Sequence, residues 1–196
     1  MMNEKPYHHG NLRNQLIETG IKLINEDGLK GFSLRKVAMN CGVSHTAPYS
    51  HFKDIDELIS AMGEYITVRF MDKLNSSLQG VEDSQEAVLC LGKAYIDFFS
   101  ENREYFQVLF YHSGISIDLN RENASDYPPY ALFRATAYKL FRSSNMPEEV
   151  FSKKLAELWS VVHGIASLLT NSGIRYNGNW KEVFIGVIGL EEGENK

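Results

Sequence analysis

The chain has 196 residues and a formal net charge of -5; 43% of its residues are hydrophobic and 23% are charged. This composition is typical of a globular protein with a core of its own, and it excludes a chain that is disordered throughout. The longest apolar run, residues 158–169, contains polar residues and is shorter than the ~20 residues that cross a bilayer, so no membrane span is expected. Two separated cysteines and the lack of an apolar signal segment favour a cytoplasmic protein.

Charge is distributed unevenly along the chain. Residues 1–53 contain seven Lys/Arg and four Asp/Glu, a net charge of +3, and four of the six histidines. Residues 54–196 contain 13 Lys/Arg and 21 Asp/Glu, a net charge of -8. A basic part beside an acidic one hints at nucleic-acid binding by the basic part, although an excess this small also arises by chance.

The first predicted helix covers residues 12–26, where apolar residues recur at helical spacing. Asn11 is a plausible N-cap, and Gly28 is expected to end the helix in a left-handed turn. Gly20 lies inside this helix, where glycine costs about 1 kcal/mol relative to alanine. That cost predicts a second helix crossing closely at Gly20.

A second helix is predicted from Ser33, its N-cap, to about Asn40. Phe32 and Val37 flank the cap in the pattern of a hydrophobic staple. The first turn holds Arg35 and Lys36 near the positive end of the helix dipole, an unfavourable place for a cation. A docked phosphate would reverse that effect, and two solvated basic side chains are the plain alternative.

The segment that follows predicts a helix-turn-helix. Gly42 makes the turn, and a third helix is predicted to begin at Ser44, with Pro48 tolerated in its first turn. Such a helix enters the major groove of DNA, and the side chains suited to hydrogen bonds there are Ser44, His45, Thr46, Tyr49 and His51. Pro48 would stiffen the helix start and meet a thymine methyl group. The alternative is a compact helical corner with solvated polar residues.

Further helices are predicted along the rest of the chain. Asp54 and Glu57 form a capping box at the start of a fourth helix. Helical spacing then recurs at residues 84–100, 103–112, 129–143, 148–171 and 180–190, whereas residues 113–128 lack periodicity and predict a long loop. Because no segment shows sustained strand alternation, the fold class is predicted to be all-α.

Residues 7–62 as a block resemble the N-terminal domain of the TetR family of bacterial transcriptional regulators. The shared features are the glycine after the first helix, the segments SLRKVA, CGVS and YSHF, and their order and spacing. Trp159, His163 and Gly164 also resemble the C-terminal signature of one TetR subgroup. The resemblance implies a DNA-binding domain at residues 1–53 and a helical ligand-binding and dimerisation domain at residues 54–196.

The resemblance also implies which side chains touch double-stranded DNA. The matching positions are Ser33, Ser44, His45, Thr46, Tyr49, His51 and Lys53. Tyr49 and Lys53 are expected on phosphates, and His45 and Thr46 nearer the bases. The family often carries a lysine where this chain has Ile55, so Lys53 is expected to replace that phosphate contact; Lys5 and Arg13 could add backbone contacts.

The C-terminal part is rich in aromatic residues, 19 of the 23 in the chain. The resemblance implies a small-molecule cavity among its helices, and an aromatic wall suits an apolar or planar ligand. The candidate wall residues are Tyr95, Phe98, Phe99, Phe106, Phe110, Phe133, Trp159 and His163. Close packing in the core is the alternative for each one, and a histidine on an apolar helix is more often a core residue than a ligand or metal contact.

Two C-terminal helices carry more apolar residues than one packed face needs. We therefore predict a homodimer formed through the helices at 148–171 and 180–190, as the resemblance also implies. The candidate interface residues are Leu158, Val162, Leu169, Trp180, Phe184 and Val187.

The sequence contains no motif of a known catalytic site, no metal-binding spacing and no cofactor fingerprint, so an enzyme is not predicted. The hypothesis is a homodimeric repressor that binds a pseudo-palindromic operator and is released by a small apolar or aromatic inducer. The alternative is a helical ligand-binding protein without sequence-specific DNA activity. Affinity for a specific duplex at physiological salt separates the two.

Overall fold

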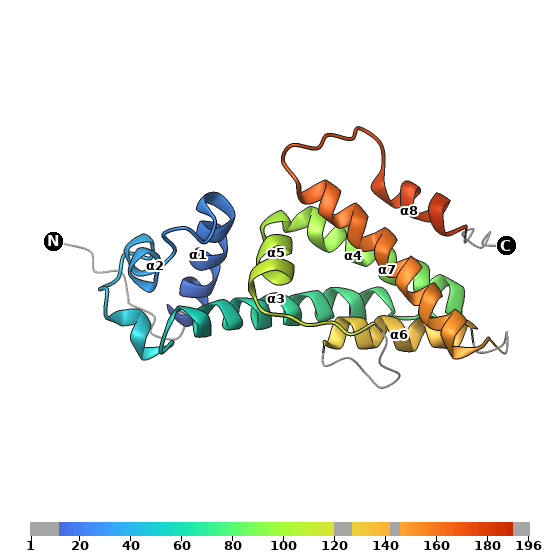
Figure 1. Cartoon of the computed structure of the whole chain (residues 1–196), viewed down its shortest axis with the longest axis horizontal. Helices are drawn as coiled ribbons and strands as arrows, with labels where there is room; N and C mark the ends of the chain where they lie inside the picture. The colour runs from blue at the N-terminus through green and yellow to red at the C-terminus, as the bar shows by residue number, and fades with distance from the viewer. Residues whose placement is uncertain (1–11, 120–126, 142–145, 190–196) are drawn as a thin grey trace. The chain divides into compact units, whose positions relative to one another are not determined.

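The computed structural model describes residues 12–119, 127–141 and 146–189, and these residues form helices without strands (Figure 1). The fold class is therefore all-α, as predicted. The candidate cap Asn11, the arm residue Lys5 and the pair His8–His9 lie outside the described residues. The described residues divide into two compact units, and residues 66–106 and 115–196 make up the second.

The first unit comprises residues 1–65 and 107–114. It contains α1 (Leu12–Asp27), α2 (Leu34–Asn40), the 3-10 helix η1 (Ala47–Ser50), the first half of α3 (Ile55–Ser77), and the π-helical turn η2 (Val108–His112). Gly28 ends α1 with a φ of 69°, as predicted. At Gly20 a larger side chain would collide with Met62 of α3, which confirms the close helix crossing expected there.

The third helix differs from the prediction. It is a 3-10 helix whose N-cap residue is Thr46, and Ser44 precedes it in the turn. Its hydrogen bonds run from the N–H of Tyr49 to the Thr46 carbonyl (3.2 Å) and from the N–H of His51 to the Pro48 carbonyl (2.9 Å). Pro48 has no N–H to give to an α-helical bond at this point, and the tighter i to i+3 pattern makes the short turn instead.

The fourth predicted helix is confirmed as α3, including its cap. Asp54 accepts a hydrogen bond from the N–H of Glu57 (2.9 Å), and the Glu57 carboxylate accepts one from the N–H of Lys53 (2.6 Å). The two bonds satisfy backbone donors that the start of a helix leaves open. They also fix the path of the chain from η1 into α3.

The second unit is a bundle around α4 (Ser84–Glu101). In Figure 1, α4 packs against α6 (Pro128–Phe141), α7 (Glu148–Thr170) and α8 (Trp180–Ile188). The helix α5 (Arg103–Gln107) and η2 together occupy the range in which one helix was predicted. One apolar cluster joins α4, α6 and α7 through Val88, Ala137, Phe151 and Leu155.

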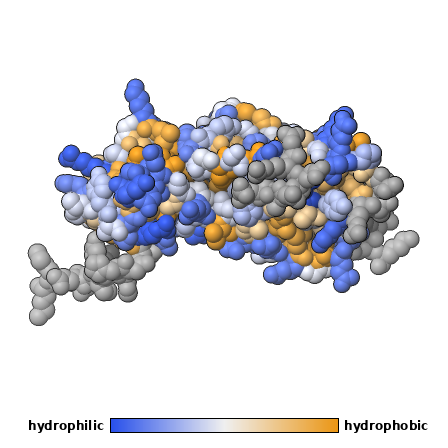
Figure 2. Space-filling model, turned by 60° about the horizontal axis from the view of Figure 1, so that its bottom comes forward, coloured by the Kyte–Doolittle hydropathy of each residue, from blue (hydrophilic) through white to orange (hydrophobic). Residues whose placement is uncertain are grey.

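Surface polarity is mixed. On the face shown in Figure 2, hydrophilic residues alternate with hydrophobic patches. The large hydrophobic side chains that are exposed include Met39, Tyr49, Val68, Tyr111, Leu168, Tyr176 and Val187. No helix in the described ranges is long and apolar enough to cross a membrane.

Candidate nucleic-acid interface and apolar cavity

The start of α2 is capped as predicted. Ser33 has an extended backbone, and its hydroxyl accepts a hydrogen bond from the N–H of Lys36 (3.2 Å). The Lys36 ammonium pairs with Asp27 (2.7 Å), whereas Arg35 is exposed. The two basic side chains at this helix end therefore differ: Lys36 is held by an acidic residue of α1, and Arg35 faces solvent.

The turn after α2 is a Schellman motif centred on Gly42. The N–H of Val43 bonds to the Ala38 carbonyl (3.0 Å), and the N–H of Gly42 bonds to the Met39 carbonyl (3.2 Å). Gly42 has a φ of 69°, a conformation that glycine adopts without the Cβ penalty of other residues. The motif turns the chain sharply so that η1 packs against α2.

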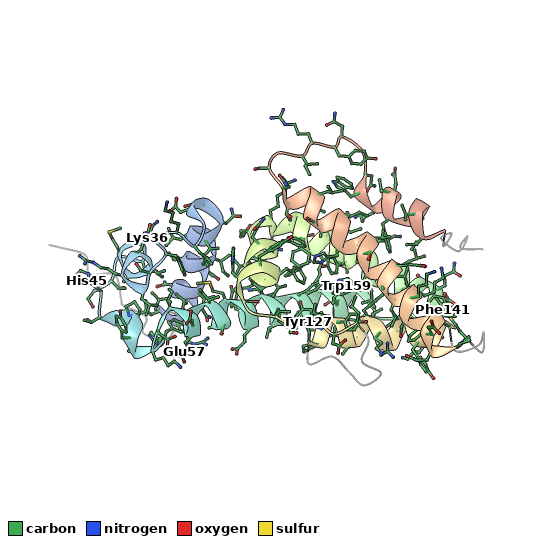
Figure 3. All side chains as sticks on the ribbon, viewed as in Figure 1. Lys36, His45, Glu57, Tyr127, Phe141 and Trp159 are labelled. Carbon is green, nitrogen blue, oxygen red and sulfur yellow. The ribbon has the colours of Figure 1, made fainter. Side chains whose placement is uncertain are left out.

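Six side chains between Ser44 and Lys53 face solvent: those of Ser44, His45, Thr46, Tyr49, Ser50 and Lys53. Tyr49 is 60% exposed, and the Lys53 side chain is 79% exposed. In Figure 3, His45 projects away from the helices of the first unit. The hydroxyls of Ser44 and Thr46 lie 3.1 Å apart and share a hydrogen bond. These groups can donate and accept hydrogen bonds along one stretch of surface, as base edges and phosphates require.

The same stretch is free of negative charge in the sequence. Residues 28–53 contain Lys30, Arg35, Lys36 and Lys53 and no Asp or Glu. The Lys53 ammonium lies 3.7 Å from Asp54, at the border of this segment. Residues 28–53 therefore offer a polyanion hydrogen-bonding groups and four cations, of which Lys36 and Lys53 have Asp27 and Asp54 beside them.

Two of the predicted DNA contacts are changed by the structure. Pro48 is buried, so its ring is not on a surface that a duplex can touch, and the burial gives no support to the expected contact with a thymine methyl group. His51 is half-buried, with its ring centroid 6.3 Å from that of Phe52. Phe52 is itself covered by Arg13, whose guanidinium lies 5.4 Å from the ring centroid. The buried side chains of Pro48 and Phe52 thus hold η1 in place, while the polar side chains of the same segment remain exposed.

The second unit contains a small apolar cavity of about 30 Å³. Its lining comes from α3, α4, α6, α7 and α8: Phe70, Leu74, Val88, Leu91, Gly92, Tyr95, Pro129, Phe133, Leu158, Trp159, Val162 and Phe184. No residue of the lining is charged. A space of this size holds about one or two water molecules, whereas ligand sites measure roughly 300–1,000 Å³. The cavity is therefore too small for an organic ligand in this structure, and a ligand can bind in it only if a wall moves.

An aromatic cluster surrounds one end of the cavity. Phe70 of α3 packs against Tyr95, Phe98 and Phe99 of α4, with ring centroids 4.8–5.3 Å apart. Phe106 continues the cluster at 5.3 Å from Phe99. Edge-to-face and offset pairs of this kind stabilise a core beyond the area that they bury. The cluster forms a stiff wall.

One polar pair is embedded in this wall. The Tyr95 hydroxyl lies 2.9 Å from Nδ1 of His163, and the His163 ring stacks on Trp159 with centroids 6.0 Å apart. Burial lowers the pKa of His163, because the charged imidazolium is poorly solvated there. Burial also raises the pKa of Tyr95, with a smaller contribution from Tyr127. Both shifts favour the neutral forms, and the tautomer of the imidazole sets which of the two groups donates the hydrogen bond.

Comparison with known proteins identifies both units. The sequence model described as bacterial regulatory proteins of the tetR family matches residues 16–62, and the model described as a tetracyclin repressor-like C-terminal domain matches residues 88–188. The second match alone covers more than half of the chain. The chain belongs to the TetR family. Members of this family are DNA-binding transcription factors and not enzymes.

Relatives and solved structures agree with this assignment. The chain is 24% identical over 184 residues to the HTH-type transcriptional regulator YvdT of Bacillus subtilis, across 92% of this chain and 85% of that protein. A protein of unknown function from Rhodococcus sp. RHA1 has the same fold with a TM-score of 0.72, 25% identity, and coverage of 96% and 100% of the two chains. A TetR-family regulator from Haemophilus influenzae has a TM-score of 0.65 at 17% identity, over 91% and 93%.

The structure brings together only part of the ligand wall predicted for this TetR-family chain. Tyr95, Phe133 and Trp159 line the cavity. Phe98, Phe99 and Phe106 are buried in the cluster behind it, and His163 lies beside Trp159. Phe110 belongs to the first unit, so its place in the wall of this cavity is corrected. Sequence reasoning missed Phe70, Gly92, Pro129 and Phe184, since apolar spacing alone does not say which core residues border a gap.

The residues predicted for the TetR-type dimer interface divide into two groups. Val162, Leu169 and Phe184 are buried within their own chain, and Leu158 and Val162 line the cavity. Val187 is 62% exposed, and Leu168 of α7 and Tyr176 of the loop before α8 are exposed as well. Phe184, at 1% exposure, is therefore corrected from interface to core. Trp180 is half-buried and packs against Tyr176, with ring centroids 4.5 Å apart and ring planes tilted by 48°.

Within the described part of the chain, no three His, Cys, Asp or Glu side chains gather as metal ligands. Neither Cys41 nor Cys90 forms a disulfide in the described ranges. Cys41 lies 3.2 Å from the Thr19 hydroxyl, between α1 and α2.

Proposed function

We propose that this TetR-family regulator is a cytoplasmic repressor that binds a pseudo-palindromic operator as a homodimer. A small apolar or aromatic molecule, bound in the second unit, releases it from DNA. The observation that carries the proposal is the exposed stretch at Ser44–Thr46, Tyr49 and Lys53, which combines hydrogen-bonding groups with the absence of carboxylates from residues 28–53.

The division of roles follows from side-chain chemistry. His45 and Thr46, in the turn before η1, are proposed to read base edges in the major groove. Tyr49 and Lys53, together with the capped α2 start at Ser33, are proposed to bind phosphates. Arg35 adds a cation beside that cap. In a dimer two such surfaces would enter major grooves about one DNA turn, ~34 Å, apart.

The homodimer is proposed to form through α7 and α8. Val187 and Leu168 are the exposed apolar residues that support this surface, and Leu158, Val162, Leu169 and Phe184 are the residues beneath it. The test is the oligomeric state in sedimentation at micromolar concentration. We expect a dimer, and we expect Val187→Asp to shift the chain toward monomer, whereas Val68→Asp, which is equally exposed on α3, leaves the dimer intact. A monomeric wild type would refute this part of the proposal.

The ligand part of the proposal rests on the apolar cavity and its aromatic wall. Regulation requires that ligand and operator compete through the conformation of the dimer. Reciprocity then follows: the operator must weaken ligand binding by the same factor by which the ligand weakens operator binding. Unequal factors at equilibrium would contradict this scheme.

The experiment that tests the function is the selection of bound fragments from a random duplex library at near-physiological salt, followed by sequencing. We expect enrichment of an inverted repeat whose half-sites lie about 10 base pairs apart or slightly more. Substitution of Tyr49, Lys53 and His45 together by alanine serves as the control and should abolish enrichment. A folded, dimeric wild type that enriches no sequence would refute sequence-specific regulation.

A further inference from the structure

Phe184 is an unusual member of the cavity wall. Its side chain is 1% exposed, and it comes from α8, a helix of nine residues, whereas the other lining residues come from helices of 14–23 residues. The tip of its ring lies over Gly92 of α4, where any Cβ would collide with the ring. Gly92 therefore acts as a notch that admits the Phe184 ring between α4 and the cavity.

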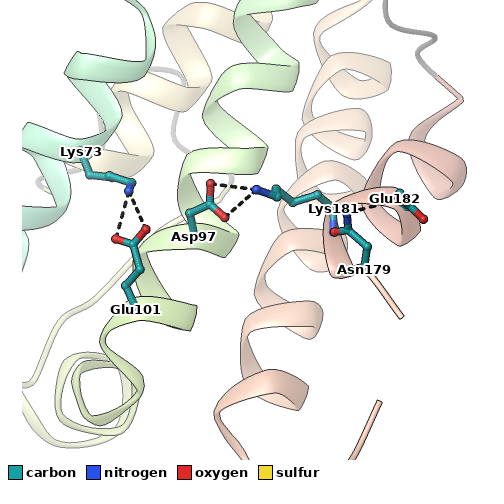
Figure 4. A network of polar contacts seen from close by, with 6 residues as sticks. All are labelled: Lys73, Asp97, Glu101, Asn179, Lys181 and Glu182. Atoms are coloured by element: carbon teal, nitrogen blue, oxygen red, sulfur yellow. Dashed lines mark hydrogen bonds and ion pairs between the residues drawn. The ribbon is translucent and has the colours of Figure 1, made fainter. Parts of the chain in front are cut away.

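The helix that carries Phe184 is the shortest of the helices that line the cavity. The loop before it, residues 171–179, is exposed throughout, and Gly189 ends α8 in a left-handed turn. α8 packs against α4 and α7, and its contacts with α4 include the Phe184 ring over Gly92 and the ion pair of Lys181 with Asp97 at 3.0 Å (Figure 4). Its side chains are 39% and 34% exposed, so solvent screens the pair and its contribution is small.

A ligand must enlarge the cavity, because about 30 Å³ admits no organic molecule. An apolar cavity of roughly 150 Å³ lined by Leu, Ile and Phe side chains stays dry and binds benzene. Removal of the Phe184 ring from its notch would open space of that order beside Leu91, Trp159 and Val162, which already line the gap.

We propose that Phe184 is a built-in plug whose ring holds the place of a ligand ring, and that an uncharged aromatic molecule binds by displacing Phe184 together with α8. The inference rests on the proposed binding of a small molecule in the second unit, and it adds the chemical class of that molecule and the wall that moves. The displaced helix also carries Val187, on the surface proposed for the dimer. Ligand binding thereby reaches the interface directly.

The restriction to uncharged ligands follows from the lining. Every lining side chain is apolar except for the Tyr95 hydroxyl and the Trp159 indole N–H, and Tyr95 already bonds to His163. A carboxylate or ammonium group placed here would lose its hydration without gaining a countercharge. A ring with one hydroxyl group can be accommodated at the Tyr95 end, since that group can exchange hydrogen bonds with Tyr95.

The first experiment measures amide hydrogen exchange in the wild-type protein, without DNA, in the presence of naphthalene, 2-naphthol or 2-naphthoate. We expect naphthalene and 2-naphthol to slow exchange in α4 and α7 and to accelerate it in residues 171–188, because the bound ring releases α8. We expect 2-naphthoate to change neither. Slower exchange in α8 with a bound probe would overturn the plug, as would equal binding of 2-naphthoate.

Two variants separate displacement from simple cavity filling. Phe184→Ala should bind naphthalene at least about tenfold more tightly than the wild type, because no plug has to be displaced first. Gly92→Ala should push the ring out of its notch and accelerate exchange in α8 without any ligand. Phe52→Ala, which opens a buried site in the first unit, is the matched control and should leave naphthalene affinity in the second-unit cavity unchanged.

Phe184→Leu keeps the core filled and serves if Phe184→Ala fails to fold; its affinity for naphthalene should lie between those of the wild type and Phe184→Ala. Equal affinity in the wild type and in all Phe184 variants would overturn the inference. Failure of the operator selection leaves these measurements valid, since none of them uses DNA. Failure of the plug leaves the operator selection valid, since that experiment uses no ligand.

Discussion

The two units of this protein place their candidate functional residues in opposite environments. In the first unit the residues proposed to bind DNA are exposed and are oriented by local motifs: the Ser33 cap, the Gly42 turn and the Asp54 capping box. In the second unit the residues proposed to surround a ligand are buried or half-buried and pack against one another. In the first unit, substitutions of these residues should therefore change DNA binding without changing stability. In the second unit, they should change ligand binding and stability together.

The strongest test of this contrast is Phe99→Ala. Phe99 is 0% exposed and lies within 5.3 Å, between ring centroids, of Phe70, Tyr95, Phe98 and Phe106. Truncation should lower the free energy of unfolding by about 3–5 kcal/mol, because it removes buried apolar surface and leaves a cavity. Urea unfolding measures this loss. Val68→Ala, at an exposed site on α3, should change stability by less than about 0.5 kcal/mol.

The first unit should give the opposite result when its surface is changed. We expect His45→Ala to alter the preference among operator sequences by about 1–3 kcal/mol, as the loss of a base contact does. Tyr49→Phe should weaken binding to all duplexes alike, since a phosphate contact carries no sequence information. Both are measured by competition binding with matched duplexes. Equal, sequence-independent losses for the two variants would show that His45 does not read bases.

Neither substitution should lower stability, because both side chains are exposed. If His45→Ala lowered the free energy of unfolding by more than about 1 kcal/mol, the expectation that surface residues of the first unit do not contribute to stability would be wrong. The same two proteins thus test the DNA-binding proposal and the comparison independently.

Stability in the first unit should depend instead on its caps. Ser33→Ala removes the acceptor for the N–H of Lys36 and should cost about 1 kcal/mol, the usual effect of losing an N-cap. Thermal unfolding measures the change. Ser60→Ala, at an exposed position inside α3, is the matched control and should be neutral or slightly stabilising, since alanine favours helix interiors. A neutral Ser33→Ala would mean that packing, not the cap, fixes α2.

Prediction from sequence worked best where structure is set by a few consecutive residues. The end of α1 at Gly28, the Ser33 cap and the Asp54–Glu57 box were predicted because each is a pattern within about four residues. The all-α class followed from helical spacing in every long segment. The third helix failed because the sequence does not say whether a chain around Pro48 closes i to i+4 or i to i+3 bonds.

The cavity was harder to predict for a physical reason. Its wall draws on α3, α4, α6, α7 and α8, and each residue there satisfies the same apolar spacing as its buried neighbours. Phe184 shows the difficulty. It belongs to the apolar face of α8, and the sequence pattern of that face fits a dimer interface as well as it fits the core. Only the notch at Gly92, on another helix, decides between them. The sequence signal for this contact was a glycine inside α4, and a glycine alone does not say which side chain packs against it.

The smallest expected effect concerns the polar pair in the wall of the second unit. Burial lowers the pKa of His163 below the ordinary value of 6.5, so the unfolded chain binds a proton at this residue more readily than the folded protein does. As pH falls through 6.5 toward the folded pKa, the unfolded state gains protons first and stability decreases. Above about pH 7 the imidazole is neutral in both states and this contribution to the pH dependence disappears.

We therefore expect the midpoint of thermal unfolding to fall between pH 7 and pH 5 by more in the wild type than in His163→Gln. Glutamine keeps a hydrogen-bonding group near the Tyr95 hydroxyl but has no proton to gain in this range. The readout is the difference between the two proteins in how steeply the unfolding midpoint changes with pH. Absolute stability is not compared, because the substitution also removes the ring stacked on Trp159. Parallel slopes would mean that His163 is as well solvated in the folded protein as in the unfolded chain. The second unit would then tolerate charge at its wall, and the restriction to uncharged ligands would lose its physical basis.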